Sequence, residues 1–408
     1  MLDGDLGPGL YRLRKAAVET LEEMRIFAHG LKIDYLNVNA VDKQVRDSIE
    51  ARGMKPVKST THEHSGKTVE IRSYPYAVMV YKNDTAIVDL LQGIGNTNDI
   101  SNAAIEQLEY NLMEKLHLLE HKNKISHVAI LEGHNEPNDM FSADLEEVLS
   151  EYFQVDRGSI NGYGIDLHIL DDYRAIIIAN PQSRFGEAER FVIDQYIMRG
   201  GSVLWAVDGV TFSEDSLQSN GSTPIIPHDI AISDMLFNYG IKIHPSLVQD
   251  VQCLSIPMQA ANSSIYSDIQ IDWTYAPLLQ ANPYHPISHN LGSVMSSFVS
   301  PISPVNVEDS IDKIVLLYSS ANSKLTNTPN EVNFNDINPD WSTFDKQHIP
   351  VGVAMEGRFT SAYTYRMAPY GVFTNEPIRK KGAKARQVVI GTGSILMRSE
   401  ERRVGKEC

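Results

Sequence analysis

Ile125-Ser126-His127-Val128-Ala129-Ile130-Leu131 is a short apolar run, and it stops at Glu132-Gly133-His134-Asn135-Glu136-Pro137. A run of this length that ends in glycine and proline predicts a buried strand followed by a turn. Two more apolar runs, 174–179 and 202–207, stop at Asn180-Pro181 and Asp208-Gly209. Between the runs, residues 145–153 and 187–199 carry apolar side chains at helical spacing. Continuous apolar strands that alternate with amphipathic helices predict a doubly wound, mostly parallel α/β sheet of the amidotransferase-like or flavodoxin-like kind.

The first 95 residues predict a smaller α/β domain. Helical spacing extends over 10–27 and 41–52, and alternation over 33–38 predicts a strand between these helices. Four further strands are expected, the last two joined by a turn at Asn83-Asp84, at 57–61, 68–72, 77–81 and 85–91. This order is compatible with a thioredoxin-like layout. The chain has no Cys-x-x-Cys, which excludes the redox chemistry of that layout.

Residues 96–397 are expected to form the second domain, after a linker at 93–98. A long helix at 100–121 leads into the central strands, and a shorter helix at 229–239 ends at Gly240. Residues 254–305 are rich in proline and aromatic residues without a period, which predicts a long irregular insertion. The other expected strands lie at 241–244, 247–253, 314–318, 351–355 and 387–390, and the last three would complete the sheet.

Composition narrows the classes of function. A net charge of −16 argues against non-specific binding to nucleic acid or to anionic lipid, because both need a basic face. The two cysteines, Cys253 and Cys408, are too few for a disulfide framework or a zinc site. No apolar run reaches the roughly 20 residues of a transmembrane helix.

Both ends of the sequence look cut. The opening Met1-Leu2-Asp3-Gly4-Asp5 resembles the last step of a strand whose beginning is missing. Residues 398–408 have no apolar period and are similar to the translation of a common sequencing adapter. We therefore interpret 398–408 as read-through and exclude it from the predicted fold.

Gly133, His134, Asn135 and Glu136 form the best candidate site for a ligand. They follow the carboxyl end of a central strand, where open α/β sheets bind ligands. Asn180 and Asp208 are expected to end neighbouring strands at the same edge. The alternative interpretation is that Gly133 only permits a tight turn, while Asn135 and Glu136 accept hydrogen bonds from nearby backbone N–H groups.

Other motifs are weaker, and we predict no metal site and no catalytic residue. Residues 117–121 spell His-x-x-Glu-His, but both histidines lie away from the apolar face of their helix, and no third ligand is evident. His62-Glu63-His64 lies in a polar loop without a ligand set. The chain has no Gly-x-Ser-x-Gly, and Ser183 has no activating histidine nearby in the sequence.

Seven segments, in order along the chain, carry a resemblance to a known family. They are Leu2-Asp3-Gly4-Asp5-Leu6, Gly133-His134-Asn135-Glu136, Asp194-Gln195-Tyr196-Ile197-Met198-Arg199-Gly200-Gly201, Asp234-Met235-Leu236-Phe237-Asn238-Tyr239-Gly240, Leu247-Val248-Gln249-Asp250, Trp273-Thr274-Tyr275-Ala276-Pro277-Leu278-Leu279 and Glu356-Gly357-Arg358-Phe359-Thr360-Ser361. Together they resemble the gliding-motility-associated ABC-transporter auxiliary proteins of GldG type, over nearly the whole of 1–397.

The resemblance implies the periplasmic domain of an inner-membrane transporter of Bacteroidota that works with an ABC ATPase and a permease. It also implies membrane anchors before residue 1 and after residue 397, and an amidotransferase-like sheet without the catalytic cysteine. The family tends to have glycine where this chain has Asn135. If that position needs a positive φ, asparagine is the next best residue after glycine.

We therefore expect a non-enzymatic transporter subunit, linked to gliding motility or secretion machinery, that binds partner subunits or an unidentified small ligand without a cofactor. The chain has no Gly-x-x-x-x-Gly-Lys-Ser/Thr, so we expect no ATP hydrolysis. One alternative is a hydrolase or amidotransferase-like enzyme that uses Glu136 or Ser183 at the sheet edge. Another is a purely structural scaffold.

Overall fold

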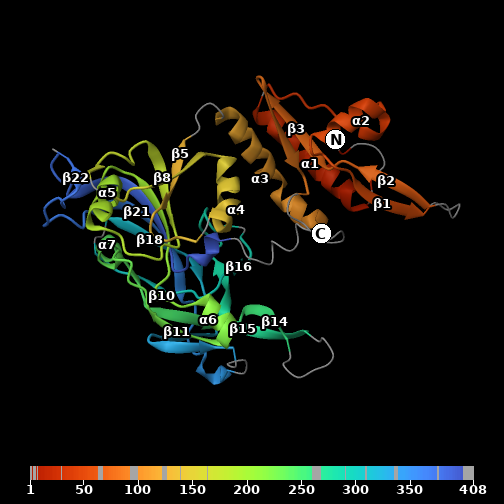
Figure 1. The fold of residues 1–408 in the computed structure, drawn as a ribbon. Helices are drawn as coiled ribbons and strands as arrows, with labels where there is room; N and C mark the ends of the chain where they lie inside the picture. The colour runs from red at the N-terminus through yellow and green to blue at the C-terminus, as the bar shows by residue number, and fades with distance from the viewer. Residues whose placement is uncertain are drawn as a thin grey trace. The chain divides into compact units, whose positions relative to one another are not determined.

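A computed structural model gives the fold of the chain (Figure 1). It describes residues 2, 6, 8–28, 30–62, 68–91, 100–121, 126–137, 139–162, 164–259, 268–289, 291–307, 310–334, 339–374 and 376–397. The expected linker at 93–98 and the tail at 398–408 lie outside this set. The chain divides into two compact units, Met1–Ile125 and Ser126–Cys408. None of the described helices combines the length and apolarity needed to cross a bilayer.

The first unit contains three α-helices and two β-hairpins among its described residues. Its elements are α1 (Pro8–Phe27), η1 (Val38–Ala40), α2 (Lys43–Ala51), β1 (Val57–His62), β2 (Thr68–Ser73), β3 (Tyr76–Tyr81), β4 (Asp84–Asp89) and α3 (Ile100–His121). Pairing of β3 with β4 leaves Lys82 and Asn83 as the two loop residues, one position before the predicted turn. Helices α1 and α3 pack with β4 through Leu13, Val88 and Leu108.

Three expectations for the first unit differ from the structure or are not confirmed by it. The strand expected at 33–38 does not form, because no described strand pairs with that stretch and Val38 begins a 3₁₀ turn. The hairpins β1–β2 and β3–β4 are separate two-stranded sheets, so the thioredoxin-like layout is not confirmed. The division of the chain also falls after α3 rather than after residue 95, since α3 packs with α1.

The second unit is built on a mixed sheet of ten strands among the described residues. Its helical elements are α4 (Asp139–Ser150), α5 (Glu187–Met198), α6 (Glu214–Asn220), α7 (Ser233–Tyr239), η3 (Trp341–Thr343) and η4 (Ser394–Leu396). Nine strands form the path of the sheet, in the spatial order β14 (Cys253–Gln259), β15 (Asp268–Ala281), β18 (Ile311–Tyr318), β21 (Pro350–Thr360), β23 (Lys381–Ile390), β9 (Ser202–Ala206), β8 (Tyr173–Ala179), β5 (His127–Glu132) and β6 (Gln154–Ser159). The tenth, β16 (Val294–Met295), pairs with β15.

Parallel pairing is confined to one half of this sheet. The contiguous strands β23, β9, β8, β5 and β6 are parallel. The apolar runs predict this for β5, β8 and β9, whereas β6 is not predicted by the sequence. Strands β18, β21 and β23 complete the sheet as expected but pair antiparallel. Short strands form smaller sheets of two or three strands around it: β7 (Ile165–Asp166), β10 (Val210–Thr211), β11 (Ser222–Pro227), β12 (Ile241–Ile243), β13 (Ser246–Asp250), β17 (Ile302–Pro304), β19 (Ser323–Asn327), β20 (Asn330–Asn333) and β22 (Val372–Phe373).

Helices cover both faces of the parallel half. Ile176 and Ile178 of β8 are fully buried in a core that includes Phe191 of α5, while Ile177 lies in a cluster with Leu145 of α4. Side chains alternate between the two faces of a strand, so α4 and α5 lie on opposite faces. The irregular insertion expected at 254–305 is only partly irregular, because β14 and β15 pair with each other and extend the sheet.

Candidate functional site

The predicted site residues gather at one edge of the parallel strands. Gly133 and His134 follow β5, Asn180 follows β8, and Asp208 lies just beyond β9. Parallel strands place their carboxyl ends at the same edge, so the predicted grouping is correct in outline. Hydrogen bonds link the loops: Asn180 N donates to Ala206 O at 2.8 Å, and Gln182 N donates to His134 O at 2.8 Å.

The loop after β23 also reaches this edge, which the sequence did not predict. Gly393 N donates to Asp208 Oδ1 at 2.8 Å. A Cβ on residue 393 would lie 2.3 Å from the Cβ of Asn180, so only glycine fits there. Burial raises the pKa of Asp208 to about 6, although the hydrogen bond from Gly393 N–H opposes that rise. Asp208 thus links the loop after β9 to the loop after β23.

The turn after β5 depends on two left-handed residues, Gly133 at φ +110° and Asn135 at φ +55°. Asparagine tolerates this region better than most residues, so the turn keeps the conformation that glycine would give. Glu136 Oε2 accepts hydrogen bonds from Gly133 N at 3.0 Å and from His134 N at 2.8 Å. Glu136 therefore satisfies the backbone of its own turn, as the alternative interpretation of the sequence proposes.

His134 lies at the centre of a closed cluster that we name the His134 clasp: His134, Glu136, Phe185 and Glu189. The residue is 2% exposed, and its ring stacks on Phe185 with 3.7 Å between the ring centroids. Nε2 lies 3.1 Å from Glu189 Oε2, and Nδ1 lies 3.4 Å from Glu136 Oε1. Both ring nitrogens therefore face carboxylates.

Electrostatics keep this histidine charged. Burial alone would lower the pKa of His134, but the carboxylates of Glu136 and Glu189 outweigh it and raise the pKa to about 9. Burial would likewise raise the pKa of both glutamates, and their interaction with His134 together with hydrogen bonds from backbone N–H groups lowers it. At neutral pH the cluster is an imidazolium between two carboxylates, so His134 has no free lone pair with which to act as a general base.

Ser183 lies on the adjoining turn but is not paired with a catalytic base. Its backbone N–H donates to His134 O at 2.8 Å. Because both nitrogens of the His134 ring face carboxylates, that ring does not activate the Ser183 hydroxyl. This local arrangement stabilises a turn and forms no nucleophile–base pair.

The part of the chain that the structure describes contains no candidate metal site. No group of three or more His, Cys, Asp or Glu side chains there is placed to hold an ion. His117 is exposed, as its position on the helix predicts. His62 ends β1, whereas Glu63 and His64 lie outside the described residues.

Sequence reasoning missed a buried polar network around Asp194, which is fully buried in α5. Its carboxylate accepts hydrogen bonds from Tyr239 Oη at 2.7 Å, Ser361 Oγ at 2.6 Å and Ala362 N at 2.8 Å. Burial raises the pKa of Asp194, against the effect of these donors. Asp194, Tyr239 and Ser361 come from three of the segments that carry the family resemblance, and an acidic residue among the apolar positions of a helix was the available signal.

Two other segments of the resemblance also meet in a buried network. Gln249 Nε2 donates to Tyr275 Oη at 3.1 Å, and Thr274 Oγ1 donates to Gln249 Oε1 at 3.0 Å. Gln249 and Thr274 are buried. In both networks, residues from the segments that carry the family resemblance join distant parts of the second unit through buried hydrogen bonds.

Comparisons with known proteins identify the family of the chain. Among solved structures, the chain is similar to the mmIFT52 N-terminal domain at 13% identity, with a TM-score of 0.38, over 69% of this chain and 94% of that domain. A search of curated proteins finds no match. The family described as "ABC-type uncharacterized transport system" matches residues 126–406, which is more than half of the chain. The protein therefore belongs to this family of ABC-transport auxiliary proteins.

Proposed function

We propose that the chain is the extracytoplasmic part of an auxiliary subunit of an inner-membrane ABC transporter, which binds the ATPase or permease subunits and catalyses no reaction. Membership of the transport family over 126–406 supports the transporter assignment. The non-catalytic part rests on one observation: the His134 clasp holds both ring nitrogens of His134, the histidine among the predicted site residues, in ion pairs with carboxylates. The periplasmic location, the link to gliding motility and the origin in Bacteroidota rest on the sequence resemblance alone.

An exposed loop in the second unit supports a role in binding another protein. Between Tyr363 and β22, the side chains of Tyr365, Met367 and Tyr370 are 98%, 89% and 87% exposed. Aromatic residues and methionine are enriched in protein interfaces, and a group of them on a surface marks an interaction site. We assign this loop to contact with a transporter subunit.

The base of the loop is held in place on the second unit. The guanidinium of Arg366 forms ion pairs with Glu187 at 3.6 Å and Asp234 at 3.5 Å, and it lies 5.7 Å from the ring centroid of Tyr363. Tyr363 is buried, and its hydroxyl donates to Glu187 O at 3.2 Å. A surface that is ordered before binding loses less conformational entropy on association, which favours recognition of a partner.

Affinity purification of the tagged protein from membranes of its native host tests the proposal. The wild-type protein should recover an ABC ATPase and a permease, and the double variant Tyr365→Ser, Met367→Ser should recover at least tenfold less of both. Tyr284→Ser is the matched control, because Tyr284 is 93% exposed in a different loop of the same unit. It should leave recovery unchanged. Failure of the wild-type protein to recover either subunit would contradict the proposal and favour a structural scaffold.

Ligand binding at the sheet edge is a separate part of the proposal. Asn135 is exposed beside the clasp, whereas Asn180 is half-buried and its Oδ1 accepts a hydrogen bond from Gln182 Nε2 at 2.7 Å, so an uncharged polar ligand would meet the Asn135 amide. The enzyme alternative is tested with a panel of ester and amide substrates. We expect no turnover. Turnover that Glu136→Gln or Ser183→Ala abolishes would overturn the non-catalytic assignment.

A further inference from the structure

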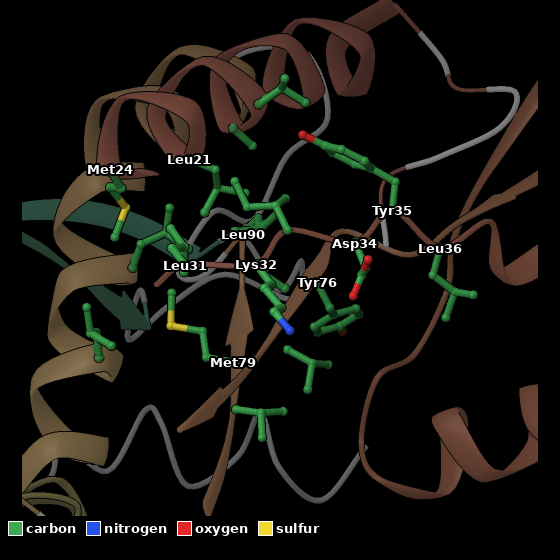
Figure 2. A pocket seen from close by; sticks show the side chains of 18 of the residues that line it. Leu21, Met24, Leu31, Lys32, Asp34, Tyr35, Leu36, Tyr76, Met79 and Leu90 are labelled. Carbon is green, nitrogen blue, oxygen red and sulfur yellow. The ribbon is translucent and has the colours of Figure 1, made fainter. Parts of the chain in front are cut away.

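The first unit contains an apolar cavity of about 780 Å³ beside β3. Helices α1 and α3, β3 and the stretch 31–36 line it, with Leu21, Met24, Leu31, Met79, Leu112 and Leu116 among the lining residues. Figure 2 shows Leu21, Met24, Leu31 and Met79 gathered around the same space. Close packing is the norm inside proteins, so an apolar space of this size calls for an occupant.

One wall of the cavity is an unpaired strand edge. The two-residue loop at Lys82-Asn83 makes Tyr81–Asp84 a hydrogen-bonded pair, so Ala77, Met79 and Tyr81 direct their backbone groups to β4. Val78 and Val80 therefore direct their backbone N–H and C=O groups to the opposite edge. Among the described residues, no strand pairs with that edge. An edge of this kind is a template for another strand.

The facing wall is a second extended stretch without a strand partner. Residues 31–36 have no regular secondary structure, and none of the described strands pairs with them. Side chains alternate over 31–34, with Leu31 and Ile33 half-buried and Lys32 and Asp34 exposed, and Tyr35 and Leu36 are both exposed. Both 31–36 and β3 are six residues long, which corresponds to about 20 Å of strand. Both stretches thus line the same cavity and are equal in length.

Leu2 and α1 indicate how an additional strand would enter the cavity. Leu2 is 6% exposed and lines the cavity itself. A strand that runs into Leu2 would be followed by the 20-residue α1 and then by the stretch 31–36. Strand, helix and strand in this order form a right-handed βαβ unit whose two strands are parallel neighbours, with the helix on one face.

We propose that this cavity accepts one apolar β-strand that leads into Leu2 and pairs with β3 on one side and with 31–36 on the other. The inserted strand would turn alternate side chains toward Leu21, Met24 and Leu116, and its backbone would satisfy the open groups of Val78 and Val80. The strand expected from the sequence at 33–38 would then form, because it would have a partner. This inference does not depend on the transporter assignment.

The test extends the whole 408-residue chain by a six-residue strand of valine and threonine ahead of Met1. Amide hydrogen exchange measures pairing directly, and we expect exchange at Val78, Val80, Ile33 and Tyr35 to slow by roughly tenfold or more. An extension of glycine and serine of equal length should change none of these rates. The same six-residue strand added as a free peptide should protect these amides only at high concentration, because linkage raises the effective concentration.

Two variants at the open edge distinguish pairing from general stabilisation. Val80 is 70% exposed, so replacing it disturbs little of the core. Val80→Pro removes the N–H that would pair and should abolish the protection of Ile33 and Tyr35 by the fused strand. Val80→Thr keeps that N–H and should preserve the protection. Equal protection in both variants, no protection in the extended chain, or filling of the cavity by a fatty acid without any effect of the strand would overturn the proposal.

Discussion

The sheet edge of the second unit and the cavity of the first unit differ in how their buried groups are satisfied. In the His134 clasp, an imidazolium that is 2% exposed has a carboxylate within 3.4 Å of each ring nitrogen. In the first unit, apolar side chains surround about 780 Å³ of space, and the adjoining edge of β3 has no described strand partner. The charges of the clasp are paired within the fold, whereas the cavity lacks a neighbouring strand.

The clasp and the cavity provide different kinds of evidence about function. Polar residues that meet at a sheet edge invite an assignment as an active site, yet the charged side chains of the clasp are paired with one another. His134 Nε2 contacts Glu189, and Nδ1 lies in an ion pair with Glu136 Oε1 without the geometry of a hydrogen bond. Buried charges carry a high cost when unpaired, so this pairing indicates a structural role. An open strand edge beside an apolar space has the opposite meaning, because it lacks the hydrogen bonds that a partner would supply.

The largest expected loss of stability comes from Glu189→Ala, which removes one of the two carboxylates of the clasp. This change leaves His134 buried with one carboxylate and removes the acceptor for Gly186 N–H. Breaking a buried ion pair from one side costs about 3–5 kcal/mol, and we expect a loss of that order. Urea unfolding followed by tryptophan fluorescence measures it, since Trp205, Trp273 and Trp341 all lie in the second unit.

Glu187→Ala is the matched control for this measurement. Glu187 lies in the same turn of α5, but its side chain is 44% exposed in its pair with Arg190. Exposed pairs contribute little, so the control should change stability by less than about 1 kcal/mol. Similar losses in the two variants would show that the clasp is not a buried ion pair.

The clasp should also make stability depend on pH. The pKa of His134 rises from 6.5 to about 9 on folding, so its stabilisation is complete below about pH 6.5 and is lost as the pH rises through 9. The rise corresponds to on the order of 3 kcal/mol. Glu136 and Glu189 have lowered pKa values, so their contribution is present above their ordinary value of 4.5 and is lost as the pH falls.

Urea unfolding at a series of pH values tests this dependence. The stability difference between wild type and Glu189→Ala should be largest between about pH 4.5 and 6.5 and should shrink on both sides. An NMR titration of the His134 ring gives its pKa directly. A value near 6.5 would contradict the predicted charge state.

The parallel half of the fold was predictable because its strands are apolar on both faces. Continuous runs such as 174–179 can be satisfied only inside a sheet with helices on both sides, and β5, β8 and β9 form there. β6 was missed because Gln154–Ser159 pairs only with β5 and carries polar residues. The strand at 33–38 was wrongly predicted since alternation alone supplies no hydrogen-bonding partner.

The site was predictable in position but not in chemistry. The sequence places Gly133, Asn180 and Asp208 at strand ends, and strand order then brings them to one edge. Glu189 is distant in sequence from His134, and a glutamate in the first turn of a helix is usually explained by the helix dipole. Its contact with His134 follows only from tertiary packing, so sequence reasoning could not find the clasp.

Because of the cavity, we expect unequal losses of stability when two leucines of α3 are replaced by alanine. Leu108 is 1% exposed in the core of the first unit, whereas Leu116 is half-buried and lines the cavity. Leu108→Ala should cost about 2–5 kcal/mol, and Leu116→Ala about 1 kcal/mol, because its methyl groups already border open space. The first unit has no tryptophan, so amide exchange along α3 is the appropriate measurement. Equal costs would show that the cavity is filled at Leu116.

The smallest expected effect concerns Asn135, at φ +55° in the turn that holds the clasp. Asn135→Ala places a residue with a poor preference for the left-handed region there and should cost about 1 kcal/mol. Asn135→Gly relieves the conformation and should be neutral within about 0.5 kcal/mol, since the side chain is exposed. Urea unfolding followed by tryptophan fluorescence distinguishes these outcomes. If alanine and glycine cost the same, then the loss comes from the asparagine amide rather than from the backbone, and the amide would have a structural role in the turn.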